Sequence, residues 1–541
     1  MFQIAIVIGL FAYVIFLFGI LGLLYKPLIL IVTILYLGLV FFIFRKKIIN
    51  PSTYPSRLSG FLSGKIFQRE RIFLFAFTLL VIQAIVNLIG ALGPEIGFDA
   101  LWYHLTLPKL YNLHHSIYPV RSGILYYGFM PKLAELLYIP ALLLGSEIYA
   151  KLIHFSFGIL TCVALYFFGR KFFSKQVAIV VCLIFYSNLV VGWESVSAYI
   201  DLTRTFFELM ALWAFMNFIE AKSKKWLFLC VVMIGFAITT KLLAIGSLII
   251  FIILILINSS GEGKYSKMIK NILIISFLAL LIPLPWFVYS YVHTGSPIFP
   301  FFTHTYPFAI DLTIFSPINM GYAFWNVLID SPDPLNPIYI GFLPLLIFLF
   351  PKFTKSIKII AFYSVISFFI WYLTPNTGGG RFLLPYLPSF SILIGAAIYH
   401  VKKSKLFTIL LVFIFLSSII SISYRLIANS KFIPVLLGHE SKSAFLTKHL
   451  NFSFGDFVDS DGYFKKHIKS TDSVLVYGVH SMYYLNFPFI DSTGVKKGEK
   501  FNYILVSNGS VPNEFKFFLE IYHNPVTHVS LYSWGGKVWV Y

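Results

Sequence analysis

The sequence predicts a mainly α-helical, polytopic membrane protein: a bundle of about 13 spanning helices followed by a small α/β domain. Three observations predict this fold class. The 541 residues are 58% hydrophobic and 12% charged, with a mean hydropathy of +0.83, whereas soluble domains carry roughly 25% charged residues. Apolar runs recur along the chain as far as residue 423. The remainder is polar and contains alternating, strand-like runs.

A spanning helix needs about 20 predominantly apolar residues, and shorter ones are tolerated in a crowded bundle. The runs 205–220, 226–240 and 337–350 are short, so the count is approximate. The first run lacks a basic region before it and a small-residue cleavage site, so we interpret it as a retained span. The candidate spans are 2–24, 27–44, 72–92, 149–168, 177–195, 205–220, 226–240, 242–258, 272–292, 337–350, 359–374, 382–400 and 406–423.

Basic residues cluster in every second loop, at 45–71, 170–175, 222–225, 264–270, 352–358 and 402–405. Cytoplasmic loops carry an excess of Lys and Arg, so we expect the N-terminus and these loops in the cytoplasm of a cell (inner or plasma) membrane. The net charge of +20 is thus spread over many loops, which argues against nucleic-acid binding. The predicted extracytoplasmic loops are 93–148, 196–204, 293–336, 375–381 and the chain after about 424.

This pattern divides the chain into an N-terminal membrane hairpin with its cytoplasmic loop (1–71), a transmembrane domain (72–423) and an extracytoplasmic α/β domain (424–541). In the first outer loop (93–148), residues 131–145 are too short to cross the membrane and return, so we expect an interfacial helix with its apolar face down. In the last domain, we expect a helix at 515–523 and strands at 473–479, 503–509, 528–534 and 537–541. The three cysteines, Cys162, Cys182 and Cys230, all lie inside apolar runs and predict neither a disulfide framework nor a metal site.

The stretch 97–111, GFDALWYHLTLPKLY, places an acid among aromatic residues just after a predicted span. If 98–105 is helical, Asp99 and Tyr103 lie on one face at i, i+4, with Trp102 beside them. A carboxylate against rings is expected to have a raised pKa and to act as a base near neutral pH. Asp99 is equally suited to begin the helix as its N-cap, and the two roles can coexist.

A second acid, Asp201, lies in WESVSAYIDLTRTFFE at the outer end of another span. Charges beside a membrane are costly and usually mark function. Asp201 is also placed to cap the span 205–220 or to pair with Arg204. His104 is suited either to bind substrate or to make a single hydrogen bond at the interface.

Two cations, Lys241 in FAITTKLLAIG and Arg381 in NTGGGRFLLPYLP, lie at the predicted outer face against the positive-inside trend. Such a cation needs an anionic partner, either an acid such as Asp201 or a phosphate. Snorkelling to lipid headgroups is the structural alternative. The three glycines before Arg381 let backbone segments approach closely.

Aromatic faces bind sugar rings, cations bind phosphate, and a carboxylate can deprotonate a hydroxyl. Together these features suit the transfer of a sugar from a membrane-anchored phosphate lipid to a hydroxyl acceptor. The sequence contains no P-loop, no Rossmann glycine fingerprint and no paired CxxC motif.

With these motifs in order, residues 70–425 resemble the GT-C superfamily of polytopic glycosyltransferases, in particular the bacterial branch similar to protein mannosyltransferases and lipid A aminoarabinose transferases. The motifs that carry the resemblance are FDALWYHLTLP (98–108), SAYIDLTRTFF (197–207), ITTKLLA (238–244) with HTGSPIFPF (293–301), and NTGGGRFLLPYLP (376–388). None of them is strict alone; their order and predicted sidedness make the case.

The resemblance implies a polyprenyl-phosphate sugar donor loaded from the outer leaflet. Attack by the acceptor hydroxyl from the face opposite the phosphate would invert the anomeric centre, and a glycan, a lipid or a protein remains open as the acceptor. The resemblance makes Asp99 the catalytic base and places Lys241 and Arg381 at the donor phosphate. The second catalytic carboxylate, Asp201, would orient the acceptor or the sugar, or stabilise positive charge on the sugar ring. Trp102, Tyr103 and His104 are the remaining substrate-binding candidates.

Many relatives have adjacent Asp and Glu in the first loop, whereas Ala100 follows Asp99 here, which weakens the case for a metal or second carboxylate at this point. No cofactor or metal ligand set is predicted. For the divalent cation that some relatives bind, His104 and Glu147 are the weak candidates.

Three alternatives remain open at this stage. Glu208 lies inside the span 205–220 and keeps a flippase or transporter of lipid-linked sugars open, because transporters use ionisable residues at membrane depth. A glycan polymerase or ligase of another multi-span fold would use similar loops. A structural membrane subunit without chemistry is the third.

Overall fold

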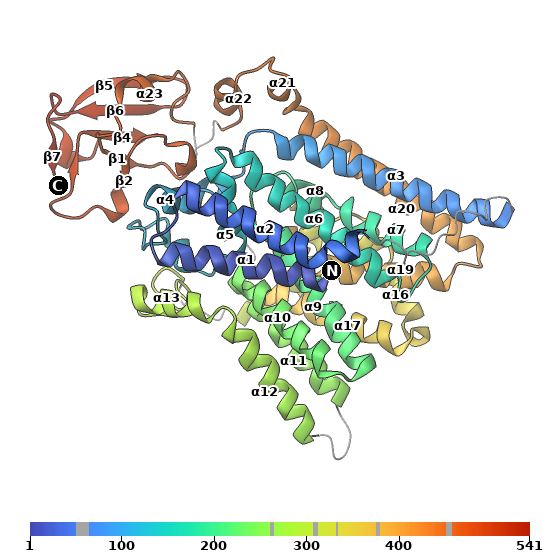
Figure 1. Ribbon diagram of the computed structural model, residues 1–541. Coiled ribbons are helices and arrows are strands. Elements are labelled where there is room, and N and C mark those ends of the chain that lie inside the picture. The colour runs from blue at the N-terminus through green and yellow to red at the C-terminus, as the bar shows by residue number, and fades with distance from the viewer. Residues whose placement is uncertain (50–63, 260–264, 307–311, 332–333, 375–378, 451–456) are drawn as a thin grey trace.

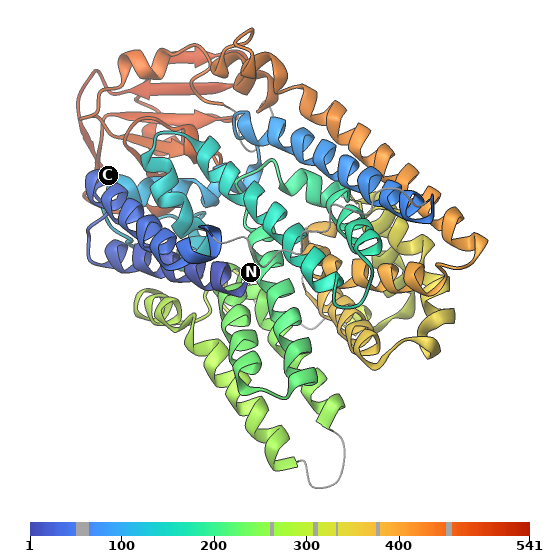
Figure 2. The ribbon, with the colours of Figure 1, turned by 45° about the vertical axis from the view of Figure 1, so that its right-hand side comes forward.

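The computed structural model describes residues 1–49, 64–259, 265–306, 312–331, 334–374, 379–450 and 457–541. Figures 1 and 2 show a long helical bundle with a small sheet domain at one end. The bundle helices are α1 (Phe2–Ile20), α2 (Lys26–Ile49), α3 (Gly64–Leu92), α4 (Thr106–Leu113), α5 (Leu133–Leu143), α6 (Glu147–Gly169), α7 (Lys175–Tyr186), α8 (Leu189–Glu194), α9 (Asp201–Ala221), α10 (Lys224–Thr240), α11 (Ile245–Ser259), α12 (Tyr265–Leu281), α13 (Leu284–Thr294), α14 (Pro317–Trp325), α15 (Ile338–Gly341), α16 (Leu343–Leu349), α17 (Lys355–Leu373), α18 (Gly380–Leu383), α19 (Leu387–His400) and α20 (Lys405–Ser430).

The chain is a multi-pass membrane protein, but a count of 13 spans is not confirmed. Among the described residues, seven helices are long and apolar enough to cross a membrane, and the bent pair α12–α13 makes an eighth candidate. Several predicted spans are instead shorter or interrupted helices. The seven are Phe2–Ile20, Lys26–Ile43, Glu70–Leu92, Glu147–Gly169, Lys355–Leu373, Gly380–His400 and Lys405–Ser430.

The interruptions have local causes. The predicted span 177–195 divides into α7 and α8, where the Asn188 side chain accepts a hydrogen bond from the Val190 N–H at 3.2 Å and starts a new helix. The span 272–292 bends by 59° between α12 and α13. Pro283 lies at this bend, and a proline lacks the N–H that would continue the helical ladder.

Helix α9 lies in the core of the bundle, where it packs most extensively against α10 and α6. Its residues 201–212 are all buried, including five polar or charged side chains, Asp201, Thr203, Arg204, Thr205 and Glu208. Charges at this depth need partners, and the three charged side chains form the ion pairs described below.

The helix expected at 131–145 is present as α5, but its surroundings differ from those expected. Residues 133–141 are all buried within the protein, because α1, α4 and α6 pack around the helix. It is therefore a core element rather than a helix with one face resting on lipid.

The C-terminal part is a small α/β domain, as predicted. Its main sheet has the strand order β2-β1-β4-β6-β5, with β1 parallel to β2 and β4, and β6 antiparallel to β4 and β5. A separate antiparallel pair joins β3 and β7. The elements are α21 (Ile433–Leu436), α22 (Lys442–His449), α23 (Tyr463–His467), β1 (Val474–Tyr477), β2 (Phe489–Asp491), β3 (Lys500–Phe501), β4 (Tyr503–Ser507), β5 (Leu519–Asn524), β6 (Val529–Ser533) and β7 (Trp539–Val540).

The prediction of a helix at 515–523 is wrong. Most of this segment is the edge strand β5, paired with β6 through Leu519↔Ser533 and Asn524↔Val529. Phe515 and Phe518 just before it are buried in an aromatic cluster. The apolar pattern of this segment suited either a helix or a strand, and its pairing with β6 therefore determines that it forms a strand.

The sheet domain is fastened to the loop 93–148. Lys109 on α4 donates hydrogen bonds to the backbone oxygens of Tyr483 (2.7 Å) and Leu485 (2.8 Å). The Tyr484 hydroxyl donates to the backbone oxygen of Glu95 at 2.9 Å. The turn η8 (Met482–Tyr484) consequently lies against η1 (Ala100–His104), the turn that comes after Asp99.

Candidate active site

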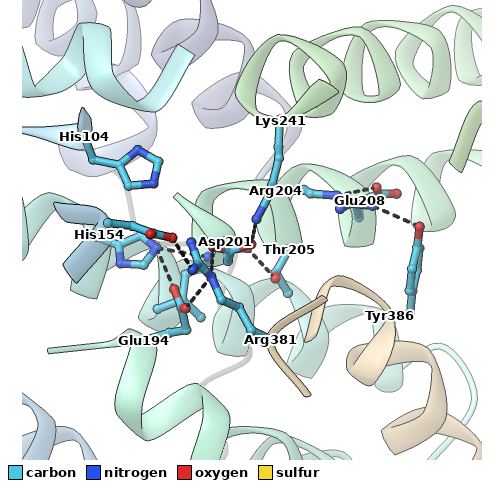
Figure 3. Close-up of polar contacts among 12 residues, drawn as sticks. His104, His154, Glu194, Asp201, Arg204, Thr205, Glu208, Lys241, Arg381 and Tyr386 are labelled. Atoms are coloured by element: carbon cyan, nitrogen blue, oxygen red, sulfur yellow. Dashed lines mark hydrogen bonds and ion pairs between the residues drawn. The ribbon is translucent and has the colours of Figure 1, made fainter. Parts of the chain in front are cut away.

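Four segments far apart in the sequence bring their charges together within the helical bundle. Figure 3 shows the contacts around Asp201, Lys241 and Arg381. Asp99 comes from the loop 93–148, Asp201 from the start of α9, Lys241 from the link between α10 and α11, and Arg381 from α18. The structure thus brings together the two predicted acids and the two predicted cations.

Arg381 is the centre of the cluster. Its Nη1 lies 2.5 Å from Asp99 Oδ2, and its Nε lies 2.9 Å from Asp201 Oδ2 and 3.2 Å from Glu194 Oε1. The guanidinium also covers the ring of Tyr199, 4.3 Å from its centroid. One fixed cation therefore holds three carboxylates, a use for which the planar guanidinium is suited.

Lys241 completes the cluster from the other side. Its Nζ lies 2.6 Å from Asp201 Oδ1 and 4.6 Å from the centre of the Phe382 ring. Lys241 has an extended backbone conformation where α10 ends. Both out-of-place cations therefore have acid partners. Asp201 does not pair with Arg204, whose guanidinium instead hydrogen-bonds to Glu208 and Tyr386.

Asp99 precedes one turn of π-helix, Ala100–His104, and makes no N-cap hydrogen bond with its side chain. Its carboxylate turns to Arg381 instead, while its backbone N–H donates to the Tyr199 hydroxyl at 3.3 Å. Burial is the largest influence and raises the pKa of Asp99, but the charge and hydrogen bond of Arg381, with the added effects of His104 and Lys241, together hold the pKa below its usual value. The expectation of a raised pKa is therefore wrong for this arrangement.

Two glycines allow the segments to meet. Gly379 has a φ of 51°, which favours glycine, and it precedes the short helix that carries Arg381. At Gly97, a Cβ atom would lie 3.0 Å from Glu95 Oε1 and 3.1 Å from the Tyr199 ring. The loop 93–148 can thus approach the segment 195–200 closely.

The three other predicted substrate-binding residues lie at different depths. Trp102 is partly exposed and Tyr103 is buried, with its ring stacked on Tyr127 at a centroid distance of 4.1 Å. His104 is buried behind them, with Nδ1 2.9 Å from Glu135 Oε1. Burial lowers the pKa of His104 more than Glu135 raises it. The ring is therefore neutral at pH 7 and lies away from solvent.

The chain was compared with known proteins. Residues 134–289 match the family model of dolichyl-phosphate-mannose-protein mannosyltransferases, a range that includes Asp201 and Lys241. A sequence search of curated proteins found no match. ArnT from Cupriavidus metallidurans bound to undecaprenyl phosphate superposes with a TM-score of 0.56 and 15% identity, over 85% of this chain and 97% of that chain. The chain has the GT-C fold.

ArnT in the apo state gives a TM-score of 0.55 at 14% identity over the same shares of the two chains. The archaeal oligosaccharyltransferase AglB from Archaeoglobus fulgidus, in complex with an inhibitory peptide and a dolichol-phosphate, gives a TM-score of 0.47 at 11% identity. That match covers 85% of this chain and 74% of AglB.

Within this GT-C fold, some residues of the cluster were not singled out by sequence reasoning. Glu194 and Tyr199 flank the loop that leads to Asp201, and both touch Arg381. His154 fixes this loop by donating from Nδ1 to the Ser197 oxygen (2.8 Å) while Nε2 accepts from the Leu202 N–H (3.0 Å). The crowding of acids and aromatics in WESVSAYID was the available signal.

A second buried hydrogen-bond network in this protein contains Glu208. Its Oε1 accepts hydrogen bonds from Arg204 Nε (3.2 Å) and from the Ser247 hydroxyl, and Tyr386 joins both partners, with its hydroxyl 2.9 Å from Arg204 Nη2 and 3.0 Å from Ser247 Oγ. Figure 3 shows this network turned away from Arg381. Glu208 is therefore held in a compact group of partners within the bundle.

The residues considered for a divalent cation lie in separate ion pairs. His104 contacts Glu135, whereas Glu147 accepts from Lys442 Nζ at 2.5 Å and from the Tyr484 hydroxyl at 3.2 Å. Within the described ranges, no group of three or more His, Cys, Asp or Glu side chains is arranged to hold a metal ion.

A small apolar groove of about 80 Å³ has one wall on α18, the short helix that carries Arg381. Leu383, which lines it, is on the same short helix as Arg381. Its other walls come from α14, the turn after it and helices α15 to α19; they include Phe324, Leu328, Leu346, Phe368 and Leu387. The groove and the charged cluster therefore share one short helix.

Proposed function

We propose that this protein is an integral-membrane glycosyltransferase that moves a sugar from a polyprenyl-phosphate donor to a hydroxyl acceptor at the extracytoplasmic face, with inversion at the anomeric carbon. The observation that carries the proposal is the Arg381 guanidinium, shared between Asp99 and Asp201 beside Lys241. This arrangement supplies a carboxylate for a hydroxyl proton and two cations for a phosphate.

The apolar groove supports a lipid-linked donor. It is lined by aliphatic and aromatic side chains and starts at Leu383, close to Arg381 along the chain. A prenyl chain in this groove would place its phosphate near Arg381 and Lys241. The resemblance of the fold to ArnT, which was solved with undecaprenyl phosphate, supports the same class of donor.

In the proposed reaction, the acceptor oxygen attacks the anomeric carbon while Asp99 takes the hydroxyl proton. The bond between the anomeric carbon and the phosphate oxygen breaks, and the phosphate leaves with the electron pair. Arg381 and Lys241 stabilise the charge that grows on the phosphate. Attack from the face opposite the leaving phosphate inverts the anomeric centre.

Exposure distinguishes the roles of the two acids. The Asp99 side chain is 19% exposed, whereas those of Asp201 and Glu194 are 0% exposed. Asp99 is thus the carboxylate that an acceptor can reach. Asp201, held by two cations, is suited to position Lys241 and Arg381 for the phosphate.

The Arg381 contact also gives the base a switch. In the resting protein the guanidinium keeps the pKa of Asp99 low, which makes it a weak base. A donor phosphate that draws Arg381 toward itself weakens that contact. The pKa of Asp99 then rises under the influence of burial, and the base strengthens when the donor is bound.

The flippase alternative receives no support from Glu208. Its carboxylate is engaged by Arg204 and Ser247, with Tyr386 bridging both partners. A group that carries cargo at membrane depth would need to exchange partners, whereas this group is packed within α9, α11 and the turn at Tyr386.

A turnover assay tests the proposed function. Purified protein is incubated with synthetic polyprenyl-phosphate hexoses and pentoses, and release of polyprenyl phosphate is measured. We expect turnover by the wild type and a ~10²–10⁴-fold loss in Asp99→Asn, the usual range for a missing general base. The matched control is Asp330→Asn, which changes an exposed acid in the turn Asn326–Asp330.

The opposite results are equally clear. Full turnover by Asp99→Asn would refute its assignment as the base. If the wild type consumed none of the donors but moved them between the leaflets of a vesicle, the transferase proposal would give way to the flippase.

A further inference from the structure

A group of aromatic side chains, here called the aromatic wall, lies beside Asp99 and is assembled from three distant parts of the chain. The loop 93–148 supplies most of it, the segment after α13 supplies one ring, and the C-terminal domain supplies another. Its members are Phe98, Trp102, Tyr126, Tyr127, Tyr306 and His480.

The rings of the wall are held in a fixed arrangement. Trp102 is perpendicular to Tyr126 and to Tyr127, at centroid distances of 6.2 and 5.3 Å. Its Nε1 donates to the backbone oxygen of Ile124 at 3.1 Å. This hydrogen bond and the neighbouring rings fix the orientation of the indole, which stays partly exposed.

Three phenol hydroxyls gather next to these rings. The Tyr306 hydroxyl lies 3.1 Å from that of Tyr126 and 3.3 Å from that of Tyr127. Burial raises the pKa of Tyr126 to about 12, so its phenol stays protonated and can both donate and accept. Tyr306 is 39% exposed, so the group can be reached from solvent. Ring faces beside neutral hydroxyls suit a saccharide, which offers C–H faces and hydroxyl groups together.

The C-terminal domain completes the wall through His480. The imidazole centroid lies 5.8 Å from that of Trp102 and 6.3 Å from that of Phe98. His480 comes after β1 and lies two residues before the start of η8, which Lys109 holds against the turn after Asp99. The position of His480 relative to Asp99 therefore depends on domain docking.

The order of contacts places the wall on the acceptor side of the reaction. Phe98 and Trp102 lie within three residues of Asp99, and Tyr126 is close enough for the Asp99 charge to affect its pKa. From Asp99 the contacts continue through Arg381 and Asp201 to Lys241. If phosphate occupies the Lys241 and Arg381 end, the hydroxyl that loses its proton to Asp99 arrives from the wall.

We infer that the aromatic wall is the acceptor subsite, that it takes a saccharide ring, and that His480 makes the C-terminal domain part of acceptor selection. This inference rests on the proposed function and deepens it, because it assigns the acceptor to one chemical class. Peptide and lipid hydroxyls are the competing acceptors that the test includes.

The test measures where the sugar goes. The full-length protein, with an active donor, is offered methyl hexosides and disaccharides, a serine- and threonine-containing peptide, a long-chain alcohol in detergent, or water alone, and the products are counted. We expect transfer to a saccharide to dominate. In His480→Ala, the ratio of saccharide transfer to hydrolysis should fall by roughly five- to tenfold and the KM for the saccharide should rise, as expected for a lost ring contact. His523→Ala, on the edge strand β5, which is separated from β1 by β4 and β6, is the control and should match the wild type.

An unchanged transfer ratio in His480→Ala, or a clear preference for the peptide or the alcohol, would overturn the inference. Failure of the proposed function is recognised separately, because then the wild type consumes no donor at all. In that case, binding of the same methyl hexosides is measured by protein fluorescence. Saturable binding that is weakened in His480→Ala would support a saccharide site at the aromatic wall. Absence of saturable binding would overturn the inference.

Discussion

Arg381 and Asp99 form an ion pair across 282 positions of the sequence, with 2.5 Å between Nη1 and Oδ2. The same guanidinium contacts Asp201 through Nε. The proposed base and the proposed anchor of the cations are therefore linked through one side chain. A change at Arg381 is expected to alter both the phosphate site and the protonation of Asp99.

Replacing Arg381 with Gln should change the pH dependence of donor turnover. The Arg381 charge holds the pKa of Asp99 low against the opposing effect of burial. Without that charge, burial dominates and the pKa rises, so the acid limb of the kcat/KM profile should move to higher pH. Loss of a charge that stabilises the leaving phosphate should also reduce kcat by ~10²–10³-fold.

The control for this change is Arg381→Lys, which keeps a positive charge but lacks the planar fork. We expect its acid limb to stay closer to that of the wild type. An identical pH profile in wild type and Arg381→Gln would show that the ion pair does not control the base.

The apolar groove predicts a dependence on prenyl chain length. Leu346 lines the groove, and Leu346→Trp should fill part of it and raise the KM for long-chain donors by about tenfold. Donors with a short prenyl chain should be affected less. Ile347→Trp is the matched control, because this neighbouring side chain is 69% exposed and does not line the groove. Equal effects on short and long donors would place the chain elsewhere.

Glu208→Gln should lower stability rather than chemistry. The substitution removes the acid beside the buried Arg204, and breaking a buried ion pair costs on the order of 3–5 kcal/mol. The midpoint of thermal unfolding in detergent should fall, while turnover per folded molecule stays within a few fold. Glu220→Gln on the same helix, where the side chain is 41% exposed, should leave the midpoint unchanged. Lost turnover with a normal midpoint would instead indicate a direct functional role.

Lys109→Met should loosen the C-terminal domain. The ammonium group donates to two backbone oxygens of the segment 483–485, and a methionine of similar length cannot. Amide hydrogen exchange in residues 480–486 should therefore speed up, with little change in the core of α9. Lys465→Met, on the exposed face of α23, is the control. Exchange that matches the wild type in both variants would show that other contacts carry the docking.

The sequence contained enough information to predict the charges of the cluster but not their partners. Lys241 and Arg381 stood out because they broke the positive-inside trend, and Asp99 and Asp201 because they lay among aromatics at span ends. Ion pairs between residues hundreds of positions apart depend on how α9 and α18 pack. The low pKa of Asp99 could not be foreseen, because the sequence showed its aromatic neighbours but not Arg381.

The wrong expectations have a similar origin. The segment 515–523 is rich in aromatics that suit a helix or a strand, and its pairing with β6 settles the matter. The segment 131–145 is apolar enough to rest on lipid, but α1 and α6 cover it instead. In both cases the local pattern correctly indicated an apolar segment, and long-range packing determined what that segment contacts.

The length of helix α20 determines how the chain that follows it is oriented toward the candidate active site. The helix runs unbroken from Lys405 to Ser430 beside α3 (Figure 2), and Asn429 near its end donates to the Val86 oxygen at 2.8 Å. Phe432 lies two residues after the helix ends and packs in one apolar cluster with Leu101, in the turn after Asp99. Each residue inserted into a helix rotates the rest of the chain beyond it by about 100°. A chimera with a foreign C-terminal domain must therefore conserve the length of α20, since a single insertion would turn Phe432 away from that turn while leaving every residue of the site intact.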